Sequence, residues 1–468
     1  MIKVGIIGGG ISGLMAAYFL SQNENIQVII FDQGNFLQDR NCPILQHKVD
    51  KCIKCASCSI MSGIAGAGAF SDGKYNITTE FGGWLQDIVG EENTLRYIEK
   101  ADEILVKFGA TKHRFLPDNE LKKECLKHGL YMLQSQCKHL GTDDNFETML
   151  KLQNDLISKE NVNIYANSKV ESIEQFGDKI LIKASNNSKI SYSPHVDYVI
   201  FAVGRVGSNF FANWCNKNKV KTINNQVDIG VRVELPSLIW DDIDSKIYEP
   251  KILYRTKQYG DICRMFCHNP HGEVVNENTD GIITVNGHAY SSPERKTNST
   301  NFALLSTINF TQPFNQPIEY ARDIAALANK ISGGSVIVQT LGDLEQGRRS
   351  DESRIKKSVT KQTLKTAVAG DLSLCMPKRQ LDNIIETLHA LDNIAQGTAN
   401  KDTLLYGVEC KYYSARPVTN DNGDIDKFEI TGKNNYYAIG DGAGFTRSLG
   451  QAAANGLMVA ETILNKVQ

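Results

Sequence analysis

Residues 4–13 read VGIIGGGISG, and this stretch decides the fold because a short apolar strand runs directly into a glycine-rich turn. Gly8, Gly10 and Gly13 have the G-x-G-x-x-G spacing of dinucleotide-binding turns. In such turns the first glycine permits the bend, the second lets the backbone approach a diphosphate, and the third lets the next helix pack closely on the sheet. We therefore expect a helix over residues 11–21 whose free N–H groups and dipole point at the phosphates.

A second apolar strand is predicted over residues 26–31, and it ends at Asp32. A carboxylate at this point can accept a hydrogen bond from a ribose 2′-hydroxyl, which favours FAD or NAD over NADP. Strand, turn, helix, strand and acid thus occur in the order that a nucleotide-binding α/β unit requires. The alternative is a glycine-rich turn in an α/β domain that binds no ligand.

Length, charge and cysteine content restrict the class of protein. The 468 residues have room for two or three domains, and 41% hydrophobic content is ordinary for a globular chain. The formal charge of -2 gives no indication of a nucleic-acid or anionic-membrane partner. No apolar run has the length of a transmembrane helix and the chain opens on a strand, so we expect a cytoplasmic protein. Eleven cysteines then favour reduced thiols, metal ligation or redox chemistry over a disulfide scaffold.

The spacing of apolar residues predicts the other main elements. Helices are expected over residues 91–108, 144–159, 317–331, 380–394 and 451–465. Short strands are expected over residues 163–165, 169–173, 180–184, 198–203 and 436–439. The strand over 198–203 is apolar throughout, which is typical of a strand buried on both faces of a parallel sheet.

Three separated segments point to one extended cofactor. They are the glycine-rich turn with Asp32, the strand that ends at Ala202-Val203-Gly204, and the motif Ile439-Gly440-Asp441 before the last helix. An elongated FAD needs separate contacts for diphosphate, ribose, ribitol and ring, whereas NAD on a single Rossmann domain would not require the second acid. For the Gly440-Asp441-Gly442 segment alone, the alternative is a hairpin turn.

The order of these segments resembles the FAD-binding domain of the two-dinucleotide-binding flavoprotein superfamily, which includes glutathione reductase. By this resemblance Asp441 hydrogen-bonds the ribitol of FAD. The same resemblance implies that the start of the last helix, at Gly450, Gln451 and Ala452, faces the pyrimidine side of the flavin.

A second resemblance covers most of the chain. Its motifs are Cys42-Pro43, the three-cysteine run 52–58, GAGAFSDGK over residues 66–74, GVRVE over 230–234, Asn309-Phe310 and the segment 438–447. Together they resemble the FAD-dependent dehydrogenases often labelled NAD-utilising dehydrogenases. This resemblance implies FAD and leaves NAD(P)H open as a transient co-substrate.

The candidate FAD contacts come from all of these segments. They are Gly8, Gly10, Ile11, Ser12, Gly13, Asp32, Gln33, Gly68, Phe70, Ser71, Asp72, Gly73, Val170, Ala202, Val203, Gly204, Gly440, Asp441, Gly450, Gln451 and Ala452. The small residues between 63 and 74 let the backbone lie flat against a large group such as a flavin ring.

Lys74, Arg232 and Arg447 are candidate catalytic cations because each adjoins a flavin-motif segment. A positive charge near the pyrimidine would stabilise anionic reduced flavin. Each of the three can equally be a surface or packing residue.

Cys42, Cys52, Cys55 and Cys58 have the spacing C-x9-C-x2-C-x2-C. They are candidate ligands of zinc or of an iron–sulfur cluster. The alternatives are a redox-active pair beside the flavin and cysteines that only pack in a glycine-rich loop. Farther along, the segment Cys263–His268 is either part of a substrate pocket or, as we favour, a half-buried strand.

We therefore predict an α/β fold in which a glutathione-reductase-like FAD-binding Rossmann domain carries an inserted α+β substrate domain. The FAD domain would comprise residues 1–235, with a Cys-rich loop at 40–75, and residues 401–468, and the substrate domain would comprise 236–400. The predicted function is an FAD-dependent oxidoreductase that passes a hydride between flavin N5 and a small organic substrate. A flavin monooxygenase and a non-enzymatic binding protein on the same fold are the alternatives, and the sequence does not indicate an oligomeric state.

Overall fold

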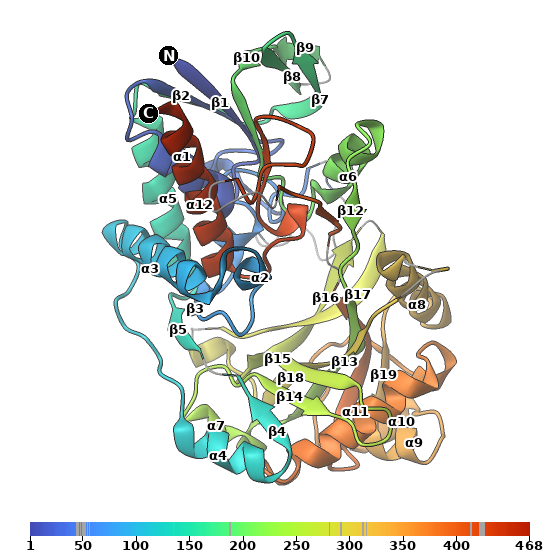
Figure 1. The fold of residues 1–468 in the computed structure, drawn as a ribbon. Helices are drawn as coiled ribbons and strands as arrows, with labels where there is room; N and C mark the ends of the chain where they lie inside the picture. The colour runs from blue at the N-terminus through green and yellow to red at the C-terminus, as the bar shows by residue number, and fades with distance from the viewer. Residues whose placement is uncertain are drawn as a thin grey trace. The chain divides into compact units, whose positions relative to one another are not determined.

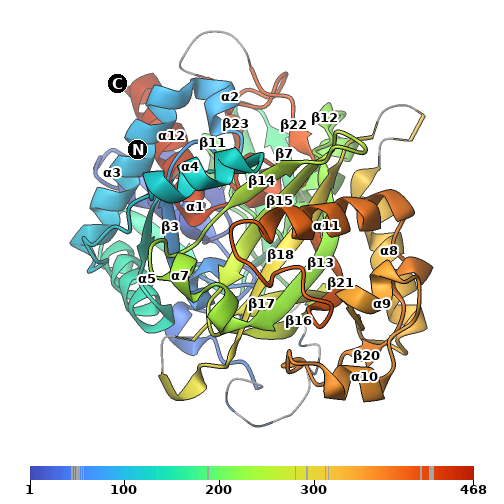
Figure 2. The same ribbon diagram turned by 90° about the horizontal axis from the view of Figure 1, so that it is seen from below.

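The protein divides into two compact units. The structure, a computed structural model, describes residues 1–43, 46, 48, 53, 55, 57–133, 135–186, 189–279, 281–290, 293–310, 313–314, 316–411, 414–420 and 426–468. Unit 1 comprises Met1–Arg114, Gln136–Ile223 and Ser414–Gln468, and unit 2 comprises Phe115–Ser135 and Asn224–Tyr413. Figures 1 and 2 show the elements of each unit in two views.

Unit 1 is built on a five-stranded parallel sheet with the first strand of the chain at its centre. In sheet order the strands are β23 (Tyr436–Ala438), β11 (Tyr198–Phe201), β1 (Ile2–Ile7), β2 (Ile26–Phe31) and β6 (Val162–Tyr165). This sheet confirms the predicted α/β arrangement. Because the strands are parallel, their carboxyl ends share one edge, and the glycine-rich turn, Asp32, Gly204 and Asp441 all follow a strand at that edge.

The main helices of unit 1 follow the predicted periodicity. They are α1 (Ile11–Leu20), α3 (Glu91–Lys107), α5 (Thr142–Ile157) and α12 (Leu449–Val467), with the short α2 (Leu85–Val89) and α6 (Ser208–Lys217). Helices α1 and α12, from opposite ends of the chain, lie side by side (Figure 1). A Cβ added at Gly456 of α12 would lie 2.1 Å from the carbonyl oxygen of Ser12, so the two backbones touch.

Smaller elements complete unit 1. They are η1 (Leu37–Asp39), η2 (Ala67–Phe70), β3 (Lys74–Ile77), β5 (Gln136–His139), β7 (Lys169–Phe176), β8 (Lys179–Asn186), β9 (Lys189–Tyr192), β10 (His195–Val196), β12 (Thr222–Ile223), β22 (Arg416–Pro417) and η6 (Asp441–Ala443). Strand β3 pairs with β5, and β7 to β10 form a separate antiparallel sheet.

Unit 2 is built on an eight-stranded, largely antiparallel sheet. Its strands, in sheet order, are β20 (Val368–Ala369), β19 (Ile337–Thr340), β21 (Leu404–Lys411), β13 (Val227–Pro236), β18 (Ser299–Ile308), β15 (Ile262–Asn269), β14 (Ile252–Arg255) and β4 (Leu130–Met132). The hairpin β16 (Glu273–Thr279) and β17 (Ile282–His288) is separate. The helices are α4 (Asn119–Lys127), α7 (Asp241–Asp244), α8 (Pro317–Ile331), α9 (Leu341–Glu345), α10 (Glu352–Lys357) and α11 (Lys378–Leu391), with η3 (Ser237–Ile239), η4 (Pro293–Arg295) and η5 (Leu372–Leu374).

Unit 2 is wider than the predicted substrate domain over residues 236–400. Strands β13 and β21, on either side of the predicted boundaries, pair with each other from Asp228 opposite Lys411 to Glu234 opposite Leu404. The earlier segment also joins this unit, because β4 pairs with β14. These pairings link residues far apart in sequence, which local patterns do not indicate.

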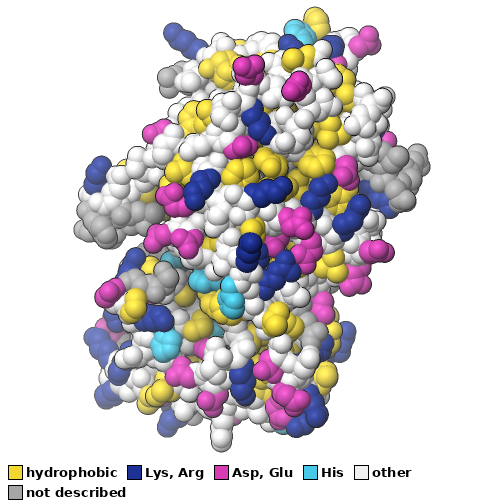
Figure 3. All heavy atoms as spheres, turned by 90° about the vertical axis from the view of Figure 1, so that its left-hand side faces the viewer, with side chains coloured by type: hydrophobic (Ala, Val, Ile, Leu, Met, Phe, Trp, Pro, Cys, Tyr) yellow, Lys and Arg dark blue, Asp and Glu magenta, His cyan; other side chains and the backbone are white. Residues whose placement is uncertain are grey.

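The surface carries charges of both signs. On the face drawn in Figure 3, Lys and Arg side chains are interspersed with Asp and Glu, in keeping with the formal net charge of -2. In the described part of the chain, no helix has both the length and the apolar character that crossing a membrane requires.

Candidate functional site

Two of the three motif glycines are required by protein packing. Gly8 has φ +106°, and a Cβ there would lie 2.3 Å from the carbonyl oxygen of Ala202 at the end of β11. A Cβ at Gly13 would lie 2.2 Å from the carbonyl oxygen of Gly8. The first glycine thus allows the turn and the third allows helix α1 to approach it.

At the middle position, neither the backbone conformation nor the neighbouring protein atoms require a glycine. Gly10 has φ -70° and ψ 178°, which any residue adopts. The nearest protein atom to an added Cβ is the Cα of Gly66, at 3.9 Å. Helix α1 begins at the next residue, and no side chain caps it. The start of α1 therefore presents backbone N–H groups without a capping side chain. This arrangement suits a diphosphate.

Asp32 ties the glycine-rich turn to the end of β2. Its Oδ2 accepts a hydrogen bond of 2.9 Å from the Gly9 N–H, and its Oδ1 accepts one of 2.9 Å from the Gly34 N–H. Burial raises the pKa of this carboxyl, and these two backbone hydrogen bonds oppose that rise. A carboxylate has about four acceptor sites, so Asp32 can still accept a hydrogen bond from a ribose hydroxyl.

Two further candidate residues, Val170 and Gln33, lie in segments next to Asp32. Val170 is buried in β7, two residues after Ser168, whose N–H donates to the carbonyl oxygen of Asp32 at 2.7 Å. The Gln33 side chain donates to the hydroxyl of Ser62 at 3.2 Å.

Arg40 is a buried residue that the sequence analysis missed. Its guanidinium donates hydrogen bonds of 2.7–2.8 Å to the carbonyl oxygens of Ser59, Ile60, Ile64 and Gly66. It lies 4.7 Å from the centre of the Phe70 ring. Burial lowers the pKa of Arg40 to about 10, although the charge of Asp32 opposes this shift. Arg40 therefore holds the backbone of the small-residue loop, residues 63–74, from its buried side. The only sequence signal for this role was the position of Arg40 between Asp32 and that loop.

The small-residue loop bridges the glycine-rich turn and the last helix. The Ala65 N–H donates to the carbonyl oxygen of Gly9 at 2.7 Å. A Cβ added at Gly68 would lie 2.5 Å from Leu449 Cδ2, at the start of α12. The loop backbone therefore lies closely against both elements, and its contact with a flavin ring stays a prediction.

Helix α5 supports the same loop. The Asn145 side chain is fully buried and donates to the carbonyl oxygen of Gly68 at 2.8 Å. Its own Oδ1 accepts from the hydroxyl of Tyr75 at 2.9 Å. The Ser71 hydroxyl also donates to the carbonyl oxygen of Gly68, at 2.7 Å. Asn145 carried no recognisable sequence signal.

The late turn brings Asp441 to the shared edge of the sheet. The Gly440 N–H donates to Asn455 Oδ1 at 2.8 Å, which fixes the turn against α12. Asp441 accepts a hydrogen bond of 2.7 Å from the Thr446 hydroxyl. Burial raises the pKa of the Asp441 carboxyl, with the charge of Arg205 opposing the rise. A Cβ at Gly442 would lie 2.2 Å from the carbonyl oxygen of Gly204, so the turns after β11 and β23 touch.

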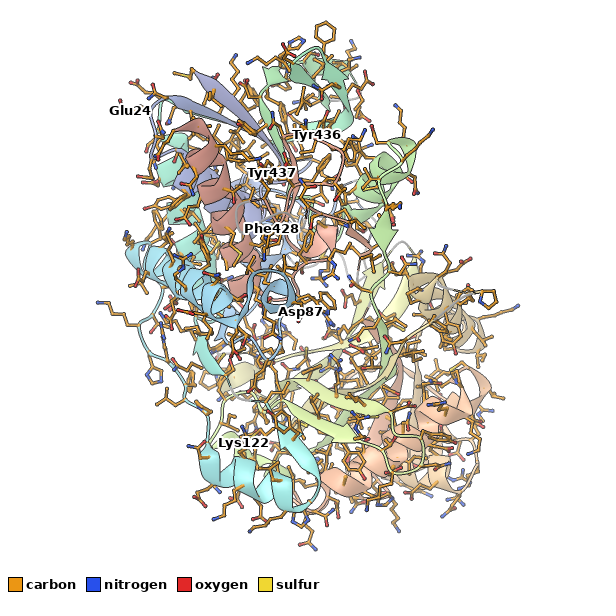
Figure 4. All side chains as sticks on the ribbon, in the orientation of Figure 1. Glu24, Asp87, Lys122, Phe428, Tyr436 and Tyr437 are labelled. Atoms are coloured by element: carbon orange, nitrogen blue, oxygen red, sulfur yellow. The ribbon has the colours of Figure 1, made fainter. Side chains whose placement is uncertain are left out.

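Aromatic packing supports this turn. The rings of Phe428 and Phe445 meet edge to face with centres 5.3 Å apart. The Ala438 N–H donates to the carbonyl oxygen of Phe428 at 3.1 Å. Figure 4 shows Phe428 near Tyr436 and Tyr437 of β23.

The start of α12 is buried and held by a segment that the sequence analysis missed. Ser448 accepts a hydrogen bond of 3.2 Å from the Gln451 N–H and caps the helix. The Gln451 side chain donates to the carbonyl oxygen of Phe81 at 3.0 Å. The Arg447 guanidinium lies 5.2 Å from the centre of the Trp84 ring. The sequence signal that could have identified this segment is the pair of glycines, Gly82 and Gly83, before Trp84.

The candidate cations lie in different units. Lys74 and Arg447 lie in unit 1, where Lys74 Nζ pairs with Asp72 Oδ2 at 3.0 Å. Arg232 lies in unit 2 and is fully buried, and its Nε and Nη2 each donate to the Glu409 carboxylate at 2.8 Å. The structure therefore brings Arg232 together with Glu409, in a paired arrangement typical of a packing residue.

The cysteine group is only partly described. Cys52 lies outside the described residues. Cys42 is a half-buried free thiol, and Cys55 and Cys58 are exposed free thiols. Among the described residues, no group of three or more His, Cys, Asp or Glu side chains is placed to hold a metal ion. Zinc or iron–sulfur ligation stays a prediction.

The segment Cys263–His268 lies in strand β15, which confirms the half-buried strand. His268 is fully buried, and its Nε2 lies 2.6 Å from Asp244 Oδ1. Its ring lies 5.0 Å from that of Trp240, so it belongs to the core of unit 2.

Family comparisons support the same cofactor. Residues 226–412 match the family described as FAD-dependent protein, C-terminal domain-like. Residues 6–37 match the NAD(P)-binding Rossmann-like domain. The first match spans nearly all of the longer segment of unit 2. The first match indicates an FAD-dependent family for residues 226–412 and the second a Rossmann-type nucleotide-binding segment at residues 6–37, whereas the glutathione-reductase-like subtype stays a prediction.

Whole-chain relatives are distant. A protein of Clostridium beijerinckii, described only as an uncharacterized protein, is 25% identical over 484 residues, which cover 98% of this chain and 80% of the relative. Glycine oxidase from Geobacillus kaustophilus has a TM-score of 0.42 at 10% identity and covers 99% of this chain and 95% of its own. p-Nitrophenol 4-monooxygenase from Pseudomonas putida has a TM-score of 0.37 at 10% identity, with 98% and 78% covered.

Proposed function

We propose that the chain is an FAD-dependent oxidoreductase that binds FAD along the carboxyl edge of the unit 1 sheet. The observation that carries the proposal is Gly10, whose missing side chain neither its backbone angles nor its protein neighbours explain. A bound diphosphate explains it, because a Cβ would occupy the space that the phosphates need. The match of residues 226–412 to an FAD-dependent protein family supports FAD as the nucleotide.

Four groups of residues would hold the cofactor. The turn at Gly8–Gly13 would bind the diphosphate through backbone N–H groups. Asp32 would accept from the ribose and Asp441 from the ribitol. The backbone of Gly68–Phe70 and the start of α12 would face the ring. These two segments lie close together, because a Cβ added at Gly68 would lie 2.5 Å from Leu449 Cδ2.

When bound, FAD supplies a hydride acceptor and donor at flavin N5. The protein then contributes position and charge. The N-terminal end of α12 directs partial positive charge toward the ring, which favours anionic reduced flavin. Lys74 and Arg447 would add to it, and Asp72 holds the Lys74 ammonium in place.

We propose that the flavin reacts with a small organic substrate, and that NAD(P)H, where it takes part, docks transiently. Unit 2 contains the whole of the FAD-dependent family match. The amino-acid sequence has no second G-x-G-x-x-G motif after a predicted strand.

The experiment is an anaerobic screen of the FAD-loaded protein against alcohols, amines, hydroxy acids and NAD(P)H. Bleaching of the flavin absorbance by one class supports hydride transfer and names that class. Oxygen uptake coupled to a hydroxylated product would reassign the protein as a monooxygenase. A protein that binds no FAD after reconstitution would refute the proposal.

A further inference from the structure

Strand β15 carries different side chains on the two faces of the unit 2 sheet. Met265 lies opposite Leu304 of β18, and both belong to the apolar core of the unit. Figure 2 shows helix α11, which contributes Ile384 and Leu388 to the same core, lying across these strands. Because side chains alternate along a strand, Arg264 extends from the opposite face of the sheet.

Arg264 has apolar neighbours on that face. Its partners in register are Leu253 of β14 on one side and Leu305 of β18 on the other. Directly opposite residues of paired strands point to the same face, so the three side chains form one row. Phe266 follows two positions later along β15 and extends from the same face. The arginine is therefore flanked by apolar side chains rather than by acids.

The Arg264 side chain is half-buried and lacks a counter-ion. Over the described ranges of the chain, its guanidinium makes no ion pair and no hydrogen bond. The Nε atom is enclosed by protein atoms, whereas Nη1 and Nη2 are accessible. Burying part of a charged group without a partner costs free energy. An unpaired group of this kind is explained by a ligand that supplies the missing acceptors.

Two other cations on the same face are paired. Arg232 lies in the row of Phe266, because both are opposite Ala303 of β18. Its Nε and Nη2 each donate to the Glu409 carboxylate at 2.8 Å. Lys411 Nζ lies 3.0 Å from the same carboxylate. Among the described residues, the chain thus supplies an acid to these two cations and none to the arginine of β15.

We propose that Arg264 is a substrate-binding residue that takes the carboxylate of an organic acid with an apolar body. This inference rests on the proposed function in one respect, since it names the substrate class of that oxidoreductase. The planar guanidinium presents parallel N–H groups to both oxygens of a carboxylate. The half-buried side chains of Leu253 and Phe266 offer apolar contact to the rest of the molecule. A neutral alcohol or an amine would leave the guanidinium unpaired.

The test is calorimetric titration of the full chain, with and without added FAD. The probes are benzoate and hexanoate, with benzamide as the neutral isostere of benzoate. At least one of the two acids should bind, and benzamide should not. Arg264→Met should weaken this binding at least about tenfold, because hydrogen bonds to a charged group are lost. Arg264→Lys should restore only part of it, because an ammonium keeps the charge without the planar pair of donors.

Arg379→Met is the matched control. Arg379 lies on α11, and its Nε and Nη2 donate to the two carboxylate oxygens of Asp261 at 2.7 Å. Its replacement should leave carboxylate binding unchanged, which separates a local site from an effect of net charge. The thermal unfolding midpoint of ligand-free Arg264→Met should not fall, because the substitution removes no ion pair or hydrogen bond to a described residue.

The outcomes separate this inference from the proposed function. A wild-type chain that takes up FAD and binds neither acid overturns the carboxylate site and leaves the proposed function standing. Wild-type binding in Arg264→Met, or inorganic phosphate binding in place of both acids, also overturns it. A lower unfolding midpoint with unchanged binding makes Arg264 a packing residue. Carboxylate binding that depends on Arg264 in a chain that takes up no FAD overturns only the proposed function.

Discussion

At the scale of single residues, the three glycines of the turn lack side chains for different reasons. Gly8 and Gly13 lack side chains because backbone oxygens lie within 2.3 Å of where a Cβ would be. Gly10 lacks one although the protein leaves room for it, with the nearest atom at 3.9 Å. The motif alone does not separate packing from ligand binding, and the structure does.

Gly10→Ala tests this distinction. The added methyl group meets only ordinary contact distance within the protein, so the thermal unfolding midpoint of the FAD-free protein should not change. The methyl group should weaken FAD binding at least tenfold by obstructing the diphosphate, measured by fluorescence titration. Gly13→Ala is the contrasting variant and should fail to fold. Wild-type FAD affinity in Gly10→Ala would contradict the proposed site.

A buried acid in unit 2 predicts how stability depends on pH. Burial raises the pKa of Glu234 from 4.5 to about 7, although hydrogen bonds from Thr363 and Tyr406 oppose the shift. Between these values the folded chain keeps a proton that the unfolded chain has released. The free energy of unfolding should therefore fall as pH rises from about 4.5 to 7, by up to about 3 kcal/mol from this group.

Glu234→Gln isolates this contribution. The amide cannot ionise, so urea unfolding of the variant should lack this loss of stability between pH 5 and 8. Parallel pH dependence in the wild type and the variant would show that Glu234 titrates with its ordinary pKa.

At the scale of elements, local patterns predicted helices well because one buried face repeats along them. The helices expected over 91–108 and 380–394 correspond to α3 at Glu91–Lys107 and α11 at Lys378–Leu391. The sequence also predicted the first strand, the turn and Asp32. It missed what depends on distant partners, namely the pairing of β13 with β21 and the supports Arg40 and Asn145.

Arg232 illustrates this limit. Its neighbours in sequence suggested a place near the flavin, whereas its partner Glu409 is 177 residues away. Arg232→Met should destabilise unit 2 by up to about 3–5 kcal/mol, because it removes two hydrogen bonds from the buried Glu409 carboxylate, which keeps its 3.0 Å ion pair with Lys411. Combining it with Glu409→Met should recover much of that loss, as measured by urea unfolding. A stable Arg232→Met protein that binds FAD and has lost turnover would instead indicate a catalytic role.

At the scale of the whole molecule, the two ends of the chain meet in unit 1, and we propose that they build one site. Strand β1 and helix α1 come from the first residues, and α12 from the last, and their backbones touch where Gly456 meets Ser12. The acids at 32 and 441 stand after strands of a single parallel sheet. Sequence order alone suggested this assembly, because each segment follows an apolar strand.

FAD titration of the apo protein, with NAD as competitor, tests the central claim most directly. We predict one FAD per chain, no displacement by NAD, and at least tenfold weaker binding in Asp441→Ala, since a hydrogen bond to a charged group contributes about 1.5–3 kcal/mol. Tight NAD binding without FAD, or wild-type FAD affinity in Asp441→Ala, would contradict it.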